Sequence, residues 1–333
     1  MAKDRVPPET LDSHCCESYK PHPDPASSTV VHNDVLRWAY MSERFASWQL
    51  DALIAVGGLG EIWRASRENS PSGEFPRADP RIGADADART FLRGNSPDAA
   101  LKRIHTHLLR NDEARSQFAR EQELAMTLPR HPNVVAGIEA DAIDGRPYIA
   151  LELVPGEDLR RTLMPAPSRA EPAPARALLS RDRAVSIVLA ACDAASHLHA
   201  NGWVHGDINP SNLVSDGERV VLIDLGIARA IGEAGTPRGT HAYMAPEQVR
   251  GEAWTPATDV FALGVVLWEL VAGARLFHRG PTWLSMQAVI EHVPATLPDR
   301  ELDAIARVAL AKHAVDRIAT PHELAERLRA TTN

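Results

Sequence analysis

The chain has 333 residues, of which 44% are hydrophobic and 24% are charged. These values match ordinary folded globular proteins, so they exclude disordered, collagen-like and coiled-coil chains. Lys and Arg number 36 against 44 Asp and Glu, which gives a net charge of −8. Because nucleic acids and anionic membranes repel a negative surface, we expect neither of them as a partner.

Three cysteines, Cys15, Cys16 and Cys192, are too few for a disulfide framework, and two of them are adjacent. A reducing compartment is therefore expected. The first residues contain no apolar segment typical of a signal peptide, and no apolar run approaches the ~18 residues that a membrane span needs. These features predict a cytoplasmic protein.

The first third of the chain is predicted to be rich in strands. Two apolar runs, 50–56 and 62–65, flank a glycine-rich segment that contains Gly57, Gly58 and Gly60. Glycines there would let backbone amides approach phosphate oxygens, although a plain hairpin turn would use the same residues. The following run 99–104 is predicted to be a strand on which Ala100, Lys102 and Ile104 share one face.

A helix is predicted over 111–128, with Asn111 as its N-cap. Glu121 lies on the apolar stripe of this helix, whereas Glu123 does not. Because an inward-pointing Lys102 needs an anion, we expect an ion pair between Lys102 and Glu121. The alternative is that both charges reach solvent at the rim of the sheet.

Proline clusters predict loops over 1–30, 66–98 and 164–176. After Arg181 the pattern is mainly helical, with an amphipathic helix over 181–200 and an almost wholly apolar one over 260–271. We therefore expect an α+β protein with two unlike lobes. The predicted division is a partly disordered extension over 1–47, a small lobe over 48–154 with an inserted loop at 66–98, and a larger lobe over 155–330.

The segment 204–224 combines two strand-like runs with an intervening Asp216-Gly217 turn. If these runs pair antiparallel, Asn212 lies close to the level of Asp224, and Asp207 lies just upstream on the same side. A few hard oxygen ligands of this kind suit Mg²⁺ held jointly with substrate phosphates. The alternative is that Asp207 and Asp224 are ordinary turn residues.

The order of these parts resembles the protein kinase signature set. The parts are the glycine loop, a strand lysine, a helix glutamate, H-x-D-x-x-x-x-N at 205–212, D-x-G at 224–226 and Ala-Pro-Glu at 245–247. The resemblance runs from about Leu50 to Leu328. The set of motifs is similar to that of bacterial serine/threonine kinases of the eukaryotic (Hanks) type. It implies a bilobal protein-kinase-like fold, with a small antiparallel-sheet N-lobe bearing one main helix and a larger, mostly helical C-lobe. It also implies that Arg317 pairs with Glu247.

The resemblance implies a role for each motif in transfer of phosphate from ATP. Lys102, oriented by Glu121, would hold the α and β phosphates, while Asn212 and Asp224 would hold Mg²⁺ or Mn²⁺. Asp207 would accept or orient the proton of the incoming hydroxyl. The residues expected to contact ATP, with Leu151 as gatekeeper, are Ala55, Val56, Gly57, Gly58, Gly60, Ile62, Ala100, Lys102, Leu151, Glu152 and Val154.

The chain departs from the family pattern at four positions. Ala55 stands for the first loop glycine, and Leu225 stands for the phenylalanine of D-F-G. Asn209, which we count among the catalytic residues, replaces a lysine that faces the γ-phosphate, so a slower enzyme is expected. Gly206 replaces an arginine that clasps a phosphorylated loop. We therefore expect activity that needs no phosphorylation of the loop over 224–247, in which Thr236 and Thr240 are the hydroxyl acceptors apart from Tyr243.

The sequence thus predicts an ATP-dependent protein kinase that phosphorylates serine and threonine of protein substrates in bacterial signalling. Thr240, seven residues before Glu247, matches the threonine of serine/threonine-specific enzymes. Two alternatives remain. Asn209 favours a pseudokinase or nucleotide-binding scaffold, and His205-Gly206-Asp207 resembles the H-G-D motif of small-molecule phosphotransferases, which lack the Ala-Pro-Glu block.

Overall fold

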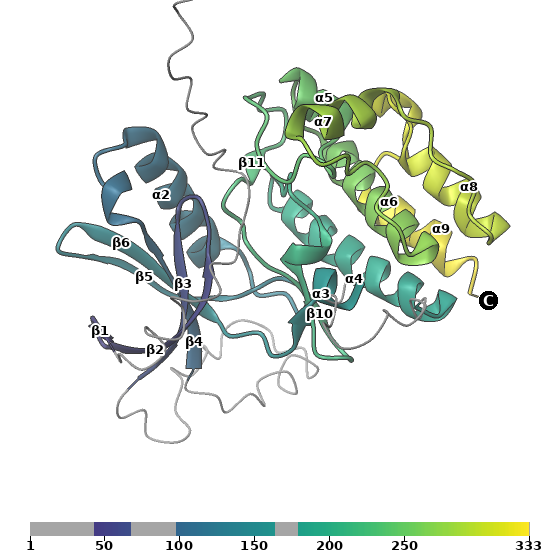
Figure 1. The fold of residues 1–333 in the computed structure, drawn as a ribbon. Helices are drawn as coiled ribbons and strands as arrows, with labels where there is room; N and C mark the ends of the chain where they lie inside the picture. Colours follow the sequence, from purple (N-terminus) through teal and green to yellow (C-terminus); the bar gives the residue numbers. More distant parts are fainter. Residues whose placement is uncertain (1–42, 68–97, 164–178, 333) are drawn as a thin grey trace, which may run out of the picture. The chain divides into compact units, whose positions relative to one another are not determined.

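The structure is a computed structural model that describes residues 43–67, 98–163 and 179–332. The proline clusters at 1–30 and 164–176 lie outside the described residues, as do the insertion from 68 to 97 and the extension up to residue 42. The described residues form a sheet with one main helix, followed by a larger helical part (Figure 1). The predicted α+β, bilobal architecture is confirmed.

The small lobe is built on a six-stranded antiparallel sheet with the order β1-β2-β3-β4-β6-β5. Its central strands pair in long registers, and Ile62 and Ile149 lie opposite Lys102 on the two sides of β4. The strands are β1 (Glu43–Phe45), β2 (Trp48–Val56), β3 (Gly60–Ser66), β4 (Asp98–Ile104), β5 (Gly137–Ile143) and β6 (Arg146–Glu152).

The first hairpin lies partly inside the predicted extension. β1 pairs with β2 around a turn in which Ala46 has a φ of 58°, and the flanking Phe45 and Trp48 are buried. The sheet therefore starts at Glu43 rather than at residue 48. A three-residue strand carries too little periodicity to be recognised, and burial of its one aromatic side chain depends on the rest of the sheet.

Each face of the sheet has its own apolar cluster. One cluster gathers Leu50, Trp63, Leu101 and Tyr148. On the other face, Phe118 of α2 (Asp112–Thr127) packs with Ile104 and Ile149 (Figure 1). Alternate β4 residues serve the two faces, because successive side chains of a strand point in opposite directions. Lys102 consequently lies on the face that α2 covers.

The helix α2 begins where the sequence predicted. The side chain of Asn111 accepts a hydrogen bond from the Ala114 N–H at 2.9 Å, which satisfies one of the first helical amides. Ala114, Phe118, Leu124 and Ala125 are buried along one face, and Glu121 is buried among them. The apolar stripe thus positions a carboxylate against the sheet.

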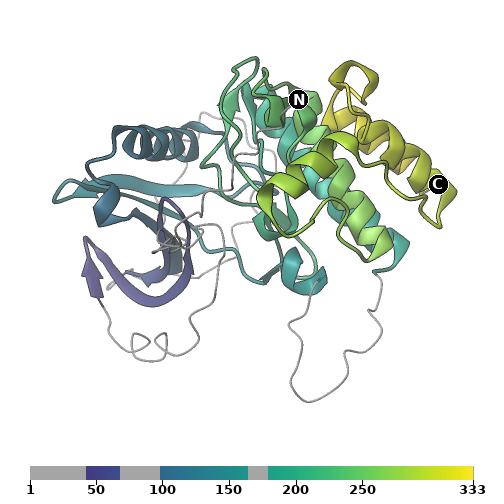
Figure 2. The ribbon, with the colours of Figure 1, turned by 45° about the horizontal axis from the view of Figure 1, so that its top comes forward.

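The larger lobe is mainly helical, and its α6 is buried along most of its length by α4, α8 and α9 (Figure 2). Within the described ranges, no helix is both long and apolar enough to cross a bilayer. The helices are α3 (Leu159–Leu163), α4 (Arg181–Ala200), α5 (Pro246–Arg250), α6 (Pro256–Ala272), α7 (Thr282–Glu291), α8 (Arg300–Ala309) and α9 (Pro321–Arg329), with short 3₁₀ turns at Thr106–Leu108, Pro210–Asn212 and Ala314–Asp316.

Short strands carry the polar motifs of this lobe. The predicted hairpin around Asp216-Gly217 is confirmed, since Leu213 lies opposite Leu222 and the Ile223 N–H donates to the Asn212 carbonyl at 2.9 Å. This pairing brings Asn212 opposite Ile223, one residue before Asp224. The strands are β7 (Glu157–Asp158), β8 (Trp203–Val204), β9 (Leu213–Ser215), β10 (Val220–Leu222) and β11 (Arg229–Ala230).

Candidate active site

Lys102 joins three structural elements at one point. Its Nζ donates to Glu121 Oε1 of α2 at 2.6 Å and to Asp224 Oδ1, just after β10, at 2.9 Å. Lys102 is only 8% exposed, and Glu121 only 3%. The predicted ion pair between Lys102 and Glu121 is confirmed, and the solvent-exposed alternative is wrong. The geometry also links both lobes through a single ammonium group.

The positive charge of Lys102 is stabilised by the two neighbouring carboxylates. Burial alone would lower the pKa of Lys102, but the carboxylates of Asp224 and Glu121 offset it and the pKa is raised. The charge of Lys102 lowers the pKa of Asp224, while burial raises that of Glu121. Lys102 therefore stays cationic and Asp224 anionic near neutral pH, which is what binding of a metal–phosphate complex requires.

Asp224 has an unusual backbone for a residue other than glycine. Its φ of 63° lies in the left-handed region, which aspartate tolerates better than most residues. Its side chain remains 43% exposed although it contacts the buried Lys102. Residues held in such conformations cluster at functional sites, where the surrounding structure offsets the strain. The Asp224 carboxylate is thus held in place and is accessible.

The carboxylate of Asp207 is held by three neighbouring residues. The backbone N–H of Thr240 donates to Oδ1 at 2.7 Å, and the side-chain amide of Asn212 donates to Oδ2 at 3.1 Å. Burial raises the pKa of Asp207, while the hydrogen bond from the Thr240 N–H opposes that rise. A carboxylate with a raised pKa is a better proton acceptor than an exposed one.

Asn209 joins Asp207 to Thr240 and is the third of these neighbours. Its Nδ2 donates to Asp207 Oδ1 and to Thr240 Oγ1, both at 3.1 Å, and its Oδ1 accepts from the Ser211 N–H at 2.9 Å. It is 2% exposed. An amide at this position can bridge neutral and anionic partners, but it cannot supply the positive charge of a lysine.

Asp259 holds the backbone just before Asp207 through hydrogen bonds, a role that the sequence did not reveal. Its carboxylate accepts hydrogen bonds from the backbone N–H groups of His205 and Gly206, at 2.9 and 2.8 Å. The same carboxylate lies 2.7 Å from Nε2 of His199. The side-chain amide of Gln248 donates a hydrogen bond to the Gly206 carbonyl at 2.9 Å. The one signal in the sequence was an acid in the first turn of an otherwise apolar helix.

The glycines of the β2–β3 turn differ in what surrounds them. A side chain at Gly58 would meet nothing within 4 Å, and one at Gly57 only the Gly60 carbonyl at 3.8 Å. By contrast, a Cβ at Gly60 would lie 2.2 Å from the Arg103 carbonyl. Gly60 is therefore required by close strand packing, whereas Gly57 and Gly58 leave space beside the backbone.

The remaining predicted nucleotide contacts lie on neighbouring strands. Ala55 and Val56 end β2 and are exposed, Ile62 and Ala100 are half-buried on β3 and β4, and Leu151 lies opposite Ala100. The Glu152 N–H is already donated to the Ala136 carbonyl at 2.8 Å. Val154 follows two residues after the end of β6 and is half-buried.

A metal site here would have few protein ligands. In the part of the chain that the structure describes, no group of three or more His, Cys, Asp or Glu side chains could hold a metal ion. The Asn212 amide nitrogen faces Asp207, at 2.9 Å from its carbonyl, so the amide oxygen is turned away from that residue. Together with the accessible Asp224, this oxygen fits an ion such as Mg²⁺, which keeps waters and phosphate oxygens as its other ligands.

The Ala-Pro-Glu block is anchored as the resemblance implied. Arg317 donates to both oxygens of Glu247, at 2.8 and 3.0 Å, and to the Ala257 carbonyl at 2.7 Å. The Arg317 side chain is fully buried, and that of Glu247 is 6% exposed. This bidentate pair joins α5 to the segment before α9 and confirms the predicted contact.

Comparisons with known proteins agree with this geometry. A profile of the protein kinase domain matches residues 86–318. Serine/threonine-protein kinase PknJ of Mycobacterium tuberculosis is 29% identical over 300 residues, which is 84% of this chain and 44% of that protein. PknB of Mycolicibacterium smegmatis is 34% identical over 251 residues, covering 68% of this chain and 37% of that protein. The chain spans less than half the length of these curated relatives.

A solved structure shares the fold. The crystal structure of a cysteine-to-alanine mutant of the Mycobacterium tuberculosis PknI kinase domain superposes with a TM-score of 0.61 at 26% identity. The match covers 88% of this chain and 98% of the PknI chain. The matched profile, the fold and the grouping of Lys102, Glu121 and Asp224 agree with one another. The chain therefore belongs to the protein kinase domain family, and the relatives named above are bacterial serine/threonine-protein kinases.

Proposed function

We propose that the chain is an ATP-dependent protein kinase that transfers the γ-phosphate to serine or threonine hydroxyls of protein substrates. The observation that carries this proposal is the single position at which Lys102 contacts both Glu121 and Asp224, at 2.6 and 2.9 Å. Such a grouping supplies a fixed positive charge beside a metal-binding carboxylate. Phosphoryl transfer depends mainly on positioning and charge stabilisation of this kind.

Each side chain has a distinct task in the proposed reaction. Lys102 binds phosphate oxygens and is oriented by the buried Glu121. Asp207, which is held by Asn212 and the Thr240 N–H, orients the hydroxyl and accepts its proton. A new bond forms between the hydroxyl oxygen and the γ-phosphorus, the bond to the bridging oxygen breaks, and ADP leaves with that oxygen's negative charge.

Asn212 and Asp224 are the proposed ligands of a divalent cation, Mg²⁺ or Mn²⁺. When bound, this cation neutralises phosphate charge and polarises the phosphoryl group. The fit rests on the chemistry of the two oxygen donors and on the accessibility of Asp224, whose side chain is 43% exposed. The exposed end of β2 and the free space beside Gly57 and Gly58 support ATP as the nucleotide.

Acceptor preference follows from Thr240. Its backbone N–H donates to Asp207, and its hydroxyl accepts from the side-chain amide of Asn209. This arrangement supports serine and threonine as acceptors. We propose cytoplasmic proteins as substrates and a role in signal transduction. Small-molecule transfer is disfavoured, because the chain keeps the anchored Ala-Pro-Glu block and resembles named protein kinases.

The test is incubation of the purified chain with radiolabelled ATP, Mg²⁺ and a generic protein substrate. We expect labelled phosphoserine and phosphothreonine, and loss of label in Asp207→Asn. Arg300→Ala, at an exposed position on α8 away from the site, is the control and should transfer normally. Binding of ATP without transfer by the wild-type chain would contradict the proposal and favour a nucleotide-binding scaffold.

A further inference from the structure

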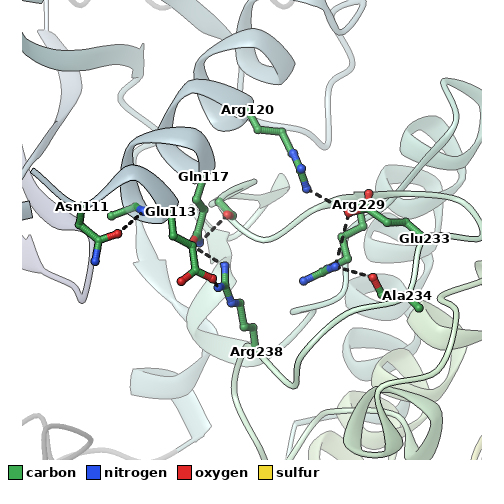
Figure 3. Close-up of polar contacts among 10 residues, drawn as sticks. Asn111, Glu113, Gln117, Arg120, Arg229, Glu233, Ala234 and Arg238 are labelled. Carbon is green, nitrogen blue, oxygen red and sulfur yellow. Dashed lines mark hydrogen bonds and ion pairs between the residues drawn. The ribbon is translucent and has the colours of Figure 1, made fainter. Parts of the chain in front are cut away.

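Polar side chains connect α2 to the segment 224–247, which we call the activation segment (Figure 3). Arg238 donates to Gln117 Oε1 at 2.9 Å and forms an ion pair with Glu113. Gln117 in turn donates to the Gly226 carbonyl at 2.8 Å. The helix is therefore attached to two points of the activation segment, one beside Asp224 and one twelve residues further along.

A second set of contacts centres on Glu233 (Figure 3). Its Oε1 lies 3.4 Å from Nη1 of Arg120 on α2 and 3.5 Å from Nη1 of Arg229 on β11. Arg229 is itself well held, because it donates to the Ala234 carbonyl at 2.9 Å and its guanidinium lies 4.8 Å from the ring centre of Trp254. A carboxylate thus bridges two arginines from different lobes.

All the α2 members of these contacts share one side of the helix. Gln117 lies four residues after Glu113, and Arg120 and Glu121 lie three and four residues after Gln117; residues so spaced are neighbours on a helical surface. Glu121 is the residue that orients Lys102. A displacement of α2 from the activation segment would therefore also move Glu121 from Lys102.

Many protein kinases have, at the position of Gly206, an arginine that binds a phosphorylated loop. An arginine could not be accommodated at this position here. Gly206 has a φ of 74°, and a Cβ there would lie 2.1 Å from the Trp254 ring. Trp254 fills that space and is wholly buried. The anion that lies between Arg120 and Arg229 is then the carboxylate of Glu233, which is part of the chain itself.

We propose that Arg238 and Glu233 are positioning residues that hold α2 so that Glu121 stays on Lys102 with no phosphate on the activation segment. The inference rests on the proposed kinase function, because it concerns how that site is kept assembled. Exposed ion pairs contribute little to global stability. Their loss should consequently change the rate of phosphate transfer and leave the melting temperature nearly unchanged.

The experiment uses the full chain after treatment with a protein phosphatase, with kcat and KM measured for a protein substrate. The treated wild type should keep its activity. Arg238→Ala should lose roughly fivefold or more in kcat, the scale of coupling between linked sites, with a smaller change in KM for the protein substrate. Glu113→Arg should also slow the enzyme, and Glu113→Arg combined with Arg238→Glu should recover most of the loss.

Arg300→Ala serves as the matched control, since Arg300 is exposed and has no ion pair within the described ranges. Loss of activity in the phosphatase-treated wild type, or a full kcat in Arg238→Ala, would overturn the inference. Should the wild type transfer no phosphate at all, the proposed function fails instead. Amide hydrogen exchange over 112–127 then decides the inference: faster exchange in Arg238→Ala than in Arg300→Ala supports it, and equal exchange refutes it.

Discussion

Asn209 connects the carboxylate of Asp207 to Thr240. Its amide holds Asp207 and Thr240 in one arrangement, at 3.1 Å from each, and is almost fully buried. It brings no charge toward a phosphate. The sequence marked this residue as a departure from the family pattern, and the structure shows that its amide binds the Asp207 carboxylate.

A pH profile tests the hydrogen bond between Asn209 and Asp207. Burial raises the pKa of Asp207 above its ordinary 3.8, and the base must be deprotonated, so kcat/KM should fall on an acid limb above that value. Asn209→Ala removes a donor that favours the anion, which raises the pKa further. We expect the acid limb to move to higher pH, with Arg300→Ala as control. A limb at unchanged pH would show that this bond does not tune Asp207.

At the scale of elements, the contact between α5 and the segment before α9 depends on one buried ion pair. Arg317 and Glu247 satisfy one another through two short hydrogen bonds, and Arg317 also donates to the Ala257 carbonyl. Removing one member leaves the other buried and unpaired, which is far more costly than losing an exposed pair.

Arg317→Ala should therefore destabilise the chain by about 3–5 kcal/mol, as measured by denaturant unfolding. The matched control is Arg327→Ala, which removes the exposed pair with Glu323 on α9 and should cost no more than about 0.5 kcal/mol. Equal effects of the two substitutions would contradict the assignment of Arg317 to a buried anchoring role.

At the scale of the whole molecule, Lys102 and Asp224 join the sheet lobe to the helical lobe. A ligand that engages both residues stabilises the folded state by mass action, because it binds only where they are assembled. Glu121 extends this connection to α2, and Arg120 of α2 extends it to Glu233 of the activation segment. The site is therefore a property of both lobes together.

Thermal unfolding with and without ATP tests this connection. ATP with Mg²⁺ should raise the apparent stability of the wild type, by about 2.7 kcal/mol at a hundredfold excess over Kd. Asp224→Asn should lose the part of the shift that requires Mg²⁺, while ATP alone still binds weakly. The comparison uses the shift for each variant, since the substitution also removes an ion pair of the free chain. A shift independent of Mg²⁺ in the wild type would contradict the proposed metal ligands.

Local features of this protein were determined by the sequence itself. Asn111 caps α2, the stripe that includes Phe118 and Glu121 is buried, and the hairpin around Asp216-Gly217 forms as predicted. Each of these depends on residues a few positions apart, where periodicity and turn chemistry act directly. The strand and helix patterns also indicated the ion pair between Lys102 and Glu121, and the order of the motifs indicated the fold.

The resemblance implied the pair of Arg317 and Glu247, but only the tertiary structure decided which other distant residues meet. Lys102 reaches Asp224 across 122 positions, and Arg238 reaches Glu113 across 125. Nothing in the sequence indicated that Trp254 fills the space beside Gly206, and an acid in the first turn of an apolar helix did not reveal that Asp259 holds the loop before Asp207. Such contacts depend on how whole elements pack against one another, and local patterns carry no information about that packing because many distant partners satisfy the same pattern.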